Sequence, residues 1–202
     1  MQPQDLRVYV VRHGETAWSL SGQHTGRTDI PLTERGEAEA EALVPWLRNV
    51  EFRHVLTSPM RRARRTCELA GLGRSVEVDD DLSEWNYGSY EGLTSADIHK
   101  SRHDWAVYRD GAPGGENPDD VSARADRLIQ RLGALKGSVA LFTHGQFASA
   151  FAARWIGLPL INAQHFMLGT ASLSILAYNP SHPDTRVIAF WNGVPSVLRD
   201  VN

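Results

Sequence analysis

Residues 6–14 read Leu-Arg-Val-Tyr-Val-Val-Arg-His-Gly, a short β-branched run that stops abruptly at a polar tripeptide. Its length and flanks favour a buried strand over residues 6–11. The run Val139 to Phe142 is built in the same way and ends on Thr143-His144-Gly145. Ligands of open α/β sheets bind beyond the carboxyl ends of the strands. If the two strands are neighbours, His13 and His144 meet in one cleft, although 131 positions separate them in the chain.

The rest of the chain alternates short strands with helices, which implies βαβ units and helices on both faces of a sheet. Residues 14–31, rich in Gly, Ser and Thr, predict a loop, whereas Thr33 and Asn117 are each expected to cap a helix. We expect an α/β three-layer sandwich with a mostly parallel central sheet, forming one domain over residues 1–202. Further strands are expected at residues 54–57, 76–78, 173–178 and 186–191, and further helices at residues 59–70, 94–102 and 147–155.

The composition is that of an ordinary globular protein, since 42% of its 202 residues are apolar and 22% are charged. The formal net charge of −3 gives no general attraction to nucleic acid or to a membrane surface, so neither is an expected partner. No run approaches the roughly 20 apolar residues of a membrane helix, and the first residues lack the apolar core of a secretory signal. The single cysteine, Cys67, fits a reducing compartment. We expect a cytoplasmic protein whose oligomeric state the sequence leaves open.

Several residues near the strand ends are typical of a phosphate site. Arg12 adjoins the first histidine, and Arg62 falls in the first turn of a helix expected to begin at Ser58-Pro59. Guanidinium groups bind phosphate oxygens in pairs, and the free N–H groups of a helix start bind anions. Release of an alcohol from a phosphate ester also needs an acid. Glu84, in an irregular segment beside aromatic residues, is the best candidate for that acid.

No metal or other cofactor is predicted. The chain has 8 histidines, but none of them combines a spacing typical of metal ligands with a third ligand. His99 and His103 lie one helical turn apart and are interpreted as surface residues. Each histidine at a strand end also has an ordinary alternative, as a hydrogen-bonded polar residue of the core.

Five blocks, in order and at suitable spacing, resemble the histidine phosphatase superfamily, also called phosphoglycerate mutase-like. The first, Val11 to Thr16, contains the Arg-His-Gly signature. The others are Thr25-Gly26 with the Pro31-Leu32-Thr33 helix start, Thr57-Ser58-Pro59 with Arg62-Ala63 and Thr66, Glu84 to Gly92 followed by Gly115-Glu116, and His144-Gly145. The resemblance covers nearly the whole chain and implies the phosphoglycerate mutase-like fold.

The resemblance also implies a role for each residue of the site. His13 is expected to attack phosphorus and become phosphorylated, and Glu84 to protonate the leaving oxygen and then activate water. Arg12, Arg62 and His144 are expected to hold the phosphate oxygens. The residues expected to bind the rest of the substrate are Ser19, Gln23, His24, Thr25, Gly26, Tyr87, Gly145 and Gln146.

Within the superfamily, Trp18-Ser19, Ser21-Gly22-Gln23 and the run Glu84 to Leu93 resemble the sedoheptulose-bisphosphatase-like branch. This resemblance implies a phosphatase whose partner is a small phosphorylated substrate, a sugar phosphate or bisphosphate. That branch has an aromatic hydroxyl where this chain has His24, so the particular sugar stays open. Trp18 and Trp85 flank the catalytic blocks and are expected to line the pocket.

Two alternative functions remain open. A cofactor-dependent phosphoglycerate mutase would form the same phosphohistidine but return the phosphoryl group to its substrate. Such mutases usually have extra segments that close over the site and exclude water, and the short region at residues 97–118 disfavours this reading. A non-catalytic module that binds a phosphate ligand or a protein would be expected to lack the nucleophile or the acid, and both are present here.

Overall fold

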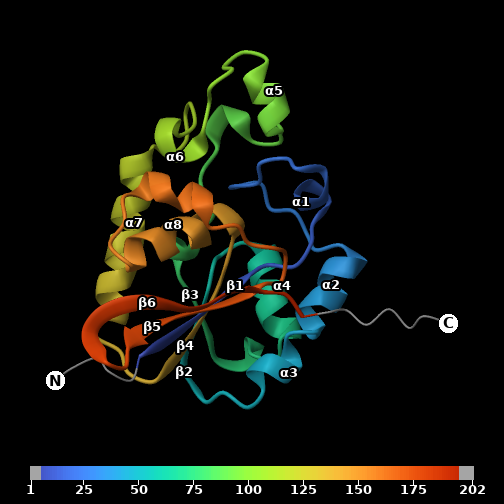
Figure 1. Ribbon diagram of the computed structural model, residues 1–202. Coiled ribbons are helices and arrows are strands. Elements are labelled where there is room, and N and C mark those ends of the chain that lie inside the picture. The colour runs from blue at the N-terminus through green and yellow to red at the C-terminus, as the bar shows by residue number, and fades with distance from the viewer. Residues whose placement is uncertain (1–5, 196–202) are drawn as a thin grey trace.

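The computed structural model describes residues 6–195 and contains a six-stranded sheet of order β3-β2-β4-β1-β5-β6 (Figure 1). The strands are β1 (Arg7–Arg12), β2 (Phe52–Thr57), β3 (Val76–Val78), β4 (Ser138–Thr143), β5 (Leu173–Asn179) and β6 (His182–Gly193). The first four strands run parallel, whereas β5 pairs antiparallel with both β1 and β6. The prediction of a mostly parallel central sheet is confirmed.

Helices cover both faces of the sheet, which confirms the three-layer α/β sandwich (Figure 1). One face carries α2 (Glu34–Glu41), α3 (Val44–Leu47) and α4 (Arg61–Leu69), and the other carries α7 (Pro118–Leu132) and α8 (Gly145–Trp155). Three short helices border a cavity at the end of the sheet where β1 and β4 finish: α1 (Ala17–Ser21), α5 (Ser95–His99) and α6 (Val107–Asp110). The 3-10 turns are η1 (Gly73–Ser75), η2 (Asp80–Leu82), η3 (Gly88–Tyr90) and η4 (Leu160–His165).

Side chains of the central strands alternate between two cores, because successive residues of a strand point to opposite faces. Val8 and Val10 of β1 pack in the core formed with α7 and α8. Tyr9 and Val11 pack in the other core, beneath α3 and α4. A strand that is buried on both faces reads as a continuous apolar run, which is why β1 could be recognised in the sequence.

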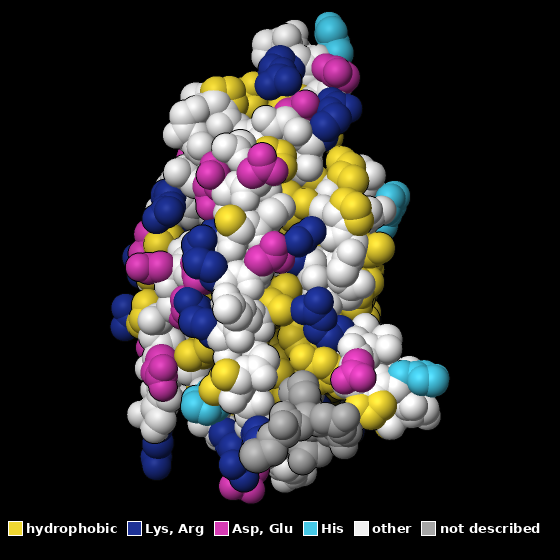
Figure 2. Space-filling model, turned by 90° about the vertical axis from the view of Figure 1, so that its left-hand side faces the viewer, with side chains coloured by type: hydrophobic (Ala, Val, Ile, Leu, Met, Phe, Trp, Pro, Cys, Tyr) yellow, Lys and Arg dark blue, Asp and Glu magenta, His cyan; other side chains and the backbone are white. Residues whose placement is uncertain are grey.

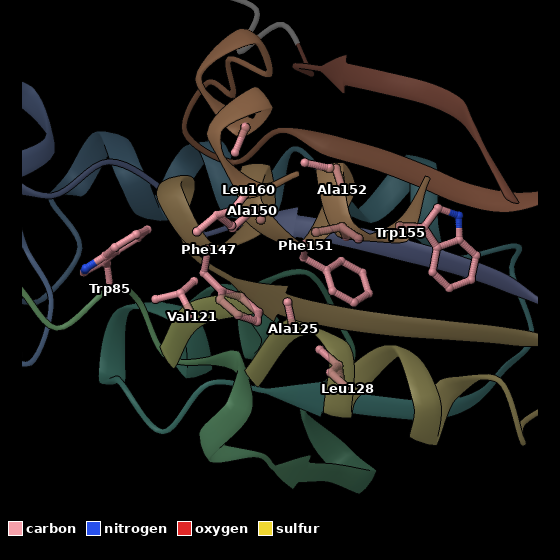
Figure 3. Close-up of a cluster of buried hydrophobic side chains, with 14 of the residues drawn as sticks. Trp85, Val121, Ala125, Leu128, Phe147, Ala150, Phe151, Ala152, Trp155 and Leu160 are labelled. Carbon is pink, nitrogen blue, oxygen red and sulfur yellow. The ribbon is translucent and has the colours of Figure 1, made fainter. Parts of the chain in front are cut away.

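The larger core lies between α7, α8 and the sheet, and Figure 3 shows its side chains. Phe147, Phe151 and Trp155 follow one another at four-residue spacing along α8 and are at most 1% exposed. Figure 3 shows Ala125 and Leu128 of α7 in the same cluster. Complete burial of one large apolar side chain contributes about 1.5–3 kcal/mol. This packing fixes the position of the start of α8, and therefore of His144, which precedes the helix.

Two local expectations are wrong. The loop predicted over residues 14–31 contains helix α1, which starts at a capping box between Thr16 and Ser19. The helix expected to begin at Ser58-Pro59 begins at Arg61 instead. Met60 is the cap residue of α4, and the Ser58 hydroxyl accepts from the N–H of Met60 at 3.3 Å in the turn that precedes the helix.

Figure 2 shows the side of the molecule that includes α7, where basic and acidic side chains are interspersed. Arg127 and Arg131 of α7 each pair with Asp81 at 2.8 Å, and Arg154 pairs with Asp126 at the same distance. This surface carries no extended field of one sign, in agreement with the small net charge. Among residues 6–195, no helix combines the length and the apolar character needed to cross a membrane.

Candidate active site

β1 and β4 are neighbours, as the interpretation of the two histidines required. The strands pair in parallel with Arg12 opposite Thr143. His13 and His144 follow these positions, and their ring centroids lie 5.2 Å apart. Both side chains are buried, because only 5% of the His13 surface and none of the His144 surface is exposed. The sheet therefore brings the two histidines together at the carboxyl ends of β1 and β4.

Backbone contact with α2 fixes the loop that follows His13. A Cβ atom on Gly14 would lie 2.2 Å from the carbonyl oxygen of Gly36, and one on Gly36 would lie 2.1 Å from that of Glu15. A side chain at either position would force the loop and α2 apart. This close approach explains the glycine of the Arg-His-Gly signature.

A backbone carbonyl sets the tautomer of His13. Its Nδ1 lies 2.7 Å from the carbonyl oxygen of Gly14, which can only accept, so Nδ1 carries the proton. Nε2 keeps its lone pair, and the side chain lines the cavity. Burial, followed by the positive charges of Arg62 and Arg12, lowers the pKa of His13 well below its usual value. The ring is therefore neutral near pH 7, and Nε2 can act as a nucleophile.

His144 and Arg62 form a buried pair beside His13. The Arg62 Nε donates to Nδ1 of His144 at 3.2 Å, so Nε2 of His144 carries the proton and donates to the Ser58 hydroxyl at 2.7 Å. The remaining guanidinium nitrogens of Arg62 donate to the carbonyl oxygens of Thr25, Gly26 and Thr28. Neither His144 nor Arg62 is among the described residues that line the cavity.

Arg12 lines the cavity. Its Nη1 donates to the carbonyl oxygen of Leu168 at 2.6 Å, whereas its buried Nε has no hydrogen-bond partner in the described part of the chain. A Cβ atom on Gly145 would lie 3.3 Å from this Nε, so the glycine leaves room for the guanidinium group. A buried donor without a partner carries a free-energy cost, which an anionic ligand would remove.

Glu84 is held by the backbone N–H group of the next residue and by two backbone N–H groups at the start of α8. Its Oε1 accepts from the N–H groups of Trp85 at 2.9 Å and Phe147 at 2.8 Å, whereas Oε2 accepts only from that of Gln146 at 3.0 Å. Burial raises the pKa of Glu84 above its usual value, although these donors and Arg62 lower it in part. Oε2 has the less occupied lone pairs, so it is the atom that can carry an acidic proton.

Arg12, His13 and Glu84 line a cavity of about 520 Å³, which is within the usual range of small-molecule sites. Most of the predicted site residues line it, namely Arg12, His13, Ser19, Gln23, His24, Thr25, Glu84, Tyr87, Gly145 and Gln146. Gly26 is not among the lining residues. Its N–H donates to Glu91 at 2.9 Å, and a Cβ atom on Gly26 would lie 2.2 Å from the carbonyl oxygen of Trp85. Gly26 therefore allows the close packing of this loop.

The cavity wall also contains residues that the sequence did not assign to the site, and the interpretation of His99 as a surface residue is wrong, because this side chain is half-buried and lines the cavity. Trp105, Tyr108 and Phe166 line it, together with Ser95 and His99 of α5. They belong to short helices and turns in which no apolar period marks a buried side. Only the folded chain brings them to the same cavity as the strand ends.

Trp18 and Trp85 are not among the lining residues, which corrects the expectation that they form the pocket wall. Trp85 is fully buried and donates from Nε1 to the carbonyl oxygen of Glu116 at 2.9 Å. Trp18 covers Gly92, where a Cβ atom would lie 3.0 Å from the indole ring. Both tryptophans support the loops around the cavity from outside it.

Arg124 of α7 holds the segment that carries Glu84. Its Nη1 donates to the carbonyl oxygen of Ser83 at 2.6 Å, and its Nε and Nη2 each donate to the Glu116 carboxylate at 3.0 Å. Glu116 in turn accepts from the N–H of Asn86 at 2.8 Å. The backbone is thus fixed on both sides of Glu84. The sequence did not identify Arg124, because it lies on α7, 40 positions away from Glu84 in the chain.

We expect Arg124→Met to lower the free energy of unfolding by about 3 kcal/mol, because it removes the charged partner of the Glu116 carboxylate and a donor to the carbonyl oxygens of Asp81 and Ser83. Arg127→Met is the matched control, since this side chain is largely exposed on the same helix. Its loss should be below about 1 kcal/mol. Urea unfolding followed by tryptophan fluorescence measures both values, and equal losses would contradict the structural role of Arg124.

Within residues 6–195, no group of three or more His, Cys, Asp or Glu side chains is arranged to hold a metal ion. His99, one of the histidines considered above, lies with Nε2 at 2.9 Å from the carbonyl oxygen of Trp105. Among the described residues that line the cavity, Arg12 is the cationic donor, and hydroxyl groups such as that of Ser19 lie beside it.

The family model of the histidine phosphatase superfamily (branch 1) matches residues 8–191. This stretch contains the two histidines, the two arginines and the glutamate described above. The chain belongs to this superfamily, as its sequence blocks predicted.

Curated relatives and solved structures agree with this assignment. An acid phosphatase of Mycobacterium tuberculosis is 42% identical over 182 residues, covering 88% of this chain and 89% of the relative. The sedoheptulose 1,7-bisphosphatase of Saccharomyces cerevisiae is 37% identical over 187 residues, with 75% and 68% covered. A probable phosphoglycerate mutase of Erwinia tasmaniensis is 30% identical over 186 residues, with 87% and 86% covered. The structure of a Mycobacterium tuberculosis open reading frame has a TM-score of 0.88 at 38% identity, covering 94% of this chain and 98% of the other.

Together, the family match and the two phosphatase relatives confirm the predicted enzyme class, a phosphatase of the histidine phosphatase superfamily.

Proposed function

We propose that this protein hydrolyses phosphate monoesters through a phosphohistidine on His13, with Glu84 as general acid and then as general base. The observation that carries the proposal is the tautomer of His13, whose Nε2 lone pair is left free by the Gly14 carbonyl. The same cavity is lined by Arg12 and Glu84. A nucleophile, a cation and an acid around one cavity supply what phosphoryl transfer from an ester to water requires.

In the first step, the Nε2 lone pair of His13 attacks phosphorus, and the P–N bond forms while the bond to the ester oxygen breaks. Glu84 gives its proton to that oxygen, so the alcohol leaves as a neutral molecule. The imidazole keeps its proton on Nδ1 and becomes positively charged. The hydrogen bond from Nδ1 to the Gly14 carbonyl strengthens with that charge and stabilises the intermediate.

In the second step, a water molecule attacks the phosphorus of phosphohistidine. The Glu84 carboxylate takes a proton from this water as the new P–O bond forms. The P–N bond breaks, and its electron pair returns to Nε2 of His13. Inorganic phosphate leaves, and both His13 and Glu84 are restored to their starting protonation states.

Arg12, Arg62 and His144 are assigned to the phosphate oxygens. The unpartnered Nε of Arg12 supports direct contact. The charge of Arg62 lowers the pKa of His13, and the ring of His144 lies beside the ring of His13. For direct contact, His144 would exchange the Ser58 hydroxyl for a phosphate oxygen. The two guanidinium groups offset negative charge on the phosphoryl group as it is transferred, and the neutral His144 ring can donate a hydrogen bond to it from Nε2.

The substrate is assigned as a small phosphate ester, and the protein as a single cytoplasmic domain that needs no cofactor. The cavity volume of about 520 Å³ supports a small substrate. The phosphatase and bisphosphatase names of two relatives support a phosphate ester, with a sugar phosphate as the favoured class.

Phosphate release from a panel of sugar phosphates, with EDTA present and bisphosphoglycerate absent, tests the proposal. We expect steady release that EDTA does not change, because every step uses protein side chains and water. If no sugar phosphate of the panel releases phosphate and mutase activity is found once bisphosphoglycerate is supplied, the phosphoglycerate mutase would be favoured. Binding without turnover would favour a non-catalytic module. Activity that is lost in EDTA and restored by one divalent metal would contradict the metal-independent mechanism.

The pH profile of kcat/KM is expected to be bell-shaped. Activity falls on the acidic side as His13 binds a proton, and the lowered pKa of His13 moves this limb well below 6.5. It falls on the alkaline side as Glu84 loses its proton, and the raised pKa of Glu84 moves this limb above 4.5. The substrate ionises in the same way with wild type and with Glu84→Gln. A difference between their pH profiles on an aryl phosphate therefore identifies the alkaline fall in activity that is due to Glu84. Identical profiles would contradict that assignment.

A further inference from the structure

The cavity offers positive charge at one place only. Among the described residues that line it, Arg12 is the single lysine or arginine, and it lies beside the catalytic histidine in the sequence. The opposite wall is built by α5 and the segments next to it, which Figure 1 shows at the top of the molecule, beyond the end of the sheet. A second phosphate on the substrate would have to bind against this outer wall.

The outer wall is polar and aromatic but carries little charge. The His24 Nε2 lies 3.1 Å from the Ser95 hydroxyl. Its ring packs against Tyr87 at a tilt of 32° and against Trp105 edge to face, with ring centroids 4.6 Å and 5.2 Å apart. Burial lowers the pKa of His24 to about 4, although the charge of Glu91 opposes this shift. His24 is therefore neutral at physiological pH and cannot act as the missing cation.

Cations near the outer wall are already paired with carboxylates. Lys100 lies 2.7 Å from Asp97, and Arg109 lies 2.8 Å from Asp110. Arg102 also approaches the Asp110 carboxylate, at 3.7 Å. None of these three basic residues lines the cavity in the described chain. Their charges are compensated on the outer surface of α5 and α6.

Backbone N–H groups do not supply the missing positive charge either. Those of Gly26, Arg27 and Thr28 converge on the Glu91 carboxylate at 2.9, 3.0 and 3.2 Å. Converging N–H groups of this kind are typical of anion-binding loops. Here a carboxylate of the protein itself occupies them, and none of these four residues lines the cavity in the described chain, so these N–H groups are not available to a phosphate bound there.

We propose that this cavity selects esters with a single phosphate on an uncharged, hydroxylated or aromatic group, and discriminates against bisphosphates. The inference rests on the proposed function. The phosphate is bound at Arg12 and His13, and the organic group is bound by hydrogen bonds from Ser95 and stacking on His24 and Trp105. A second dianionic group would lose its water without gaining a cation, which makes its transfer into the cavity unfavourable.

Matched substrate pairs test this selection at about pH 7.5, where unperturbed imidazoles are largely neutral. Initial phosphate release is compared for fructose 6-phosphate and fructose 1,6-bisphosphate, and for ribulose 5-phosphate and ribulose 1,5-bisphosphate, with p-nitrophenyl phosphate as a general reporter. We expect kcat/KM to be at least ~10-fold higher for the monophosphate of each pair, a difference of about 1.4 kcal/mol. Equal or faster hydrolysis of both bisphosphates would overturn the inference while leaving the phosphatase intact. No release from any compound, the aryl ester included, would instead overturn the proposed function.

A designed cation tests whether the missing charge causes the selection. Ser95→Lys places an ammonium group on the outer wall, and Ala96→Lys adds the same charge to an exposed neighbour that does not line the cavity. Both leave the Thr94 cap of α5 in place. We expect the ratio of bisphosphate to monophosphate kcat/KM to rise several-fold in Ser95→Lys alone. Equal ratios in the two variants, with both still active on p-nitrophenyl phosphate, would overturn the electrostatic explanation.

Discussion

His13→Ala is expected to reduce phosphate release by at least ~10³-fold on every substrate, because it removes the atom that forms the bond to phosphorus. The fold should be unaffected, since within residues 6–195 the His13 ring bonds only to the carbonyl of the adjacent Gly14. The measurement is kcat/KM, together with acid quenching of the reaction and detection of acid-labile phosphate on the protein. Wild type should carry this phosphate and the variant should not.

His103→Ala is the control for the loss of a histidine, because His103 is exposed and does not line the cavity. It should keep wild-type activity. Retention of even a tenth of the activity in His13→Ala would exclude His13 as the nucleophile. Phosphate trapped on His144 in wild type would exclude it as well and would reverse the roles of the two rings.

Glu84→Gln is expected to reduce the rate by ~10²- to 10⁴-fold on alkyl phosphates, the usual contribution of general acid catalysis. The loss should be much smaller on aryl phosphates, because a phenolate leaves without prior protonation. The amide also replaces one of the two carboxylate oxygens, of which Oε1 accepts hydrogen bonds from Trp85 and Phe147 and Oε2 accepts one from Gln146. Thermal unfolding of the variant therefore has to be measured beside its activity.

A series of aryl phosphates with leaving groups of different pKa separates these two effects. Loss of the general acid makes the rate depend more steeply on leaving-group pKa, whereas a disturbed fold lowers every rate by the same factor. Equal losses on alkyl and aryl substrates, with an unchanged slope, would contradict the role of Glu84 as the acid.

Part of the candidate site could be predicted, because Arg12 ends a buried strand and His13 and His144 directly follow buried strands. The β-branched runs before His13 and His144 mark two strand ends that the sheet then brings together. Arg62 and Glu84 are marked by their sequence blocks rather than by any periodicity. Local hydrogen bonding was harder to predict, since the capping box between Thr16 and Ser19 lies in a segment whose composition indicates a loop.

The outer half of the cavity could not be predicted from sequence patterns. Its residues come from α5, α6 and η4, which are short and have no apolar stripe that shows which side is buried. The neutral state of His24 depends on burial by the aromatic rings of Tyr87 and Trp105, and these contacts exist only in the folded chain. Charge selection by this wall is therefore a property of the tertiary structure.

The position of β1 at the centre of the sheet has a consequence for synthesis on the ribosome. Its two neighbours, β4 and β5, begin at Ser138 and Leu173, so more than a hundred residues must be added before β1 finds either partner. At the usual rates of translation this takes roughly 6 to 30 s, during which an apolar strand stays unpaired and exposed to aggregation. Phosphatase activity can therefore appear only after β4 and β5 have been synthesised, and its yield in timed translation would report how well chaperones protect the nascent strand.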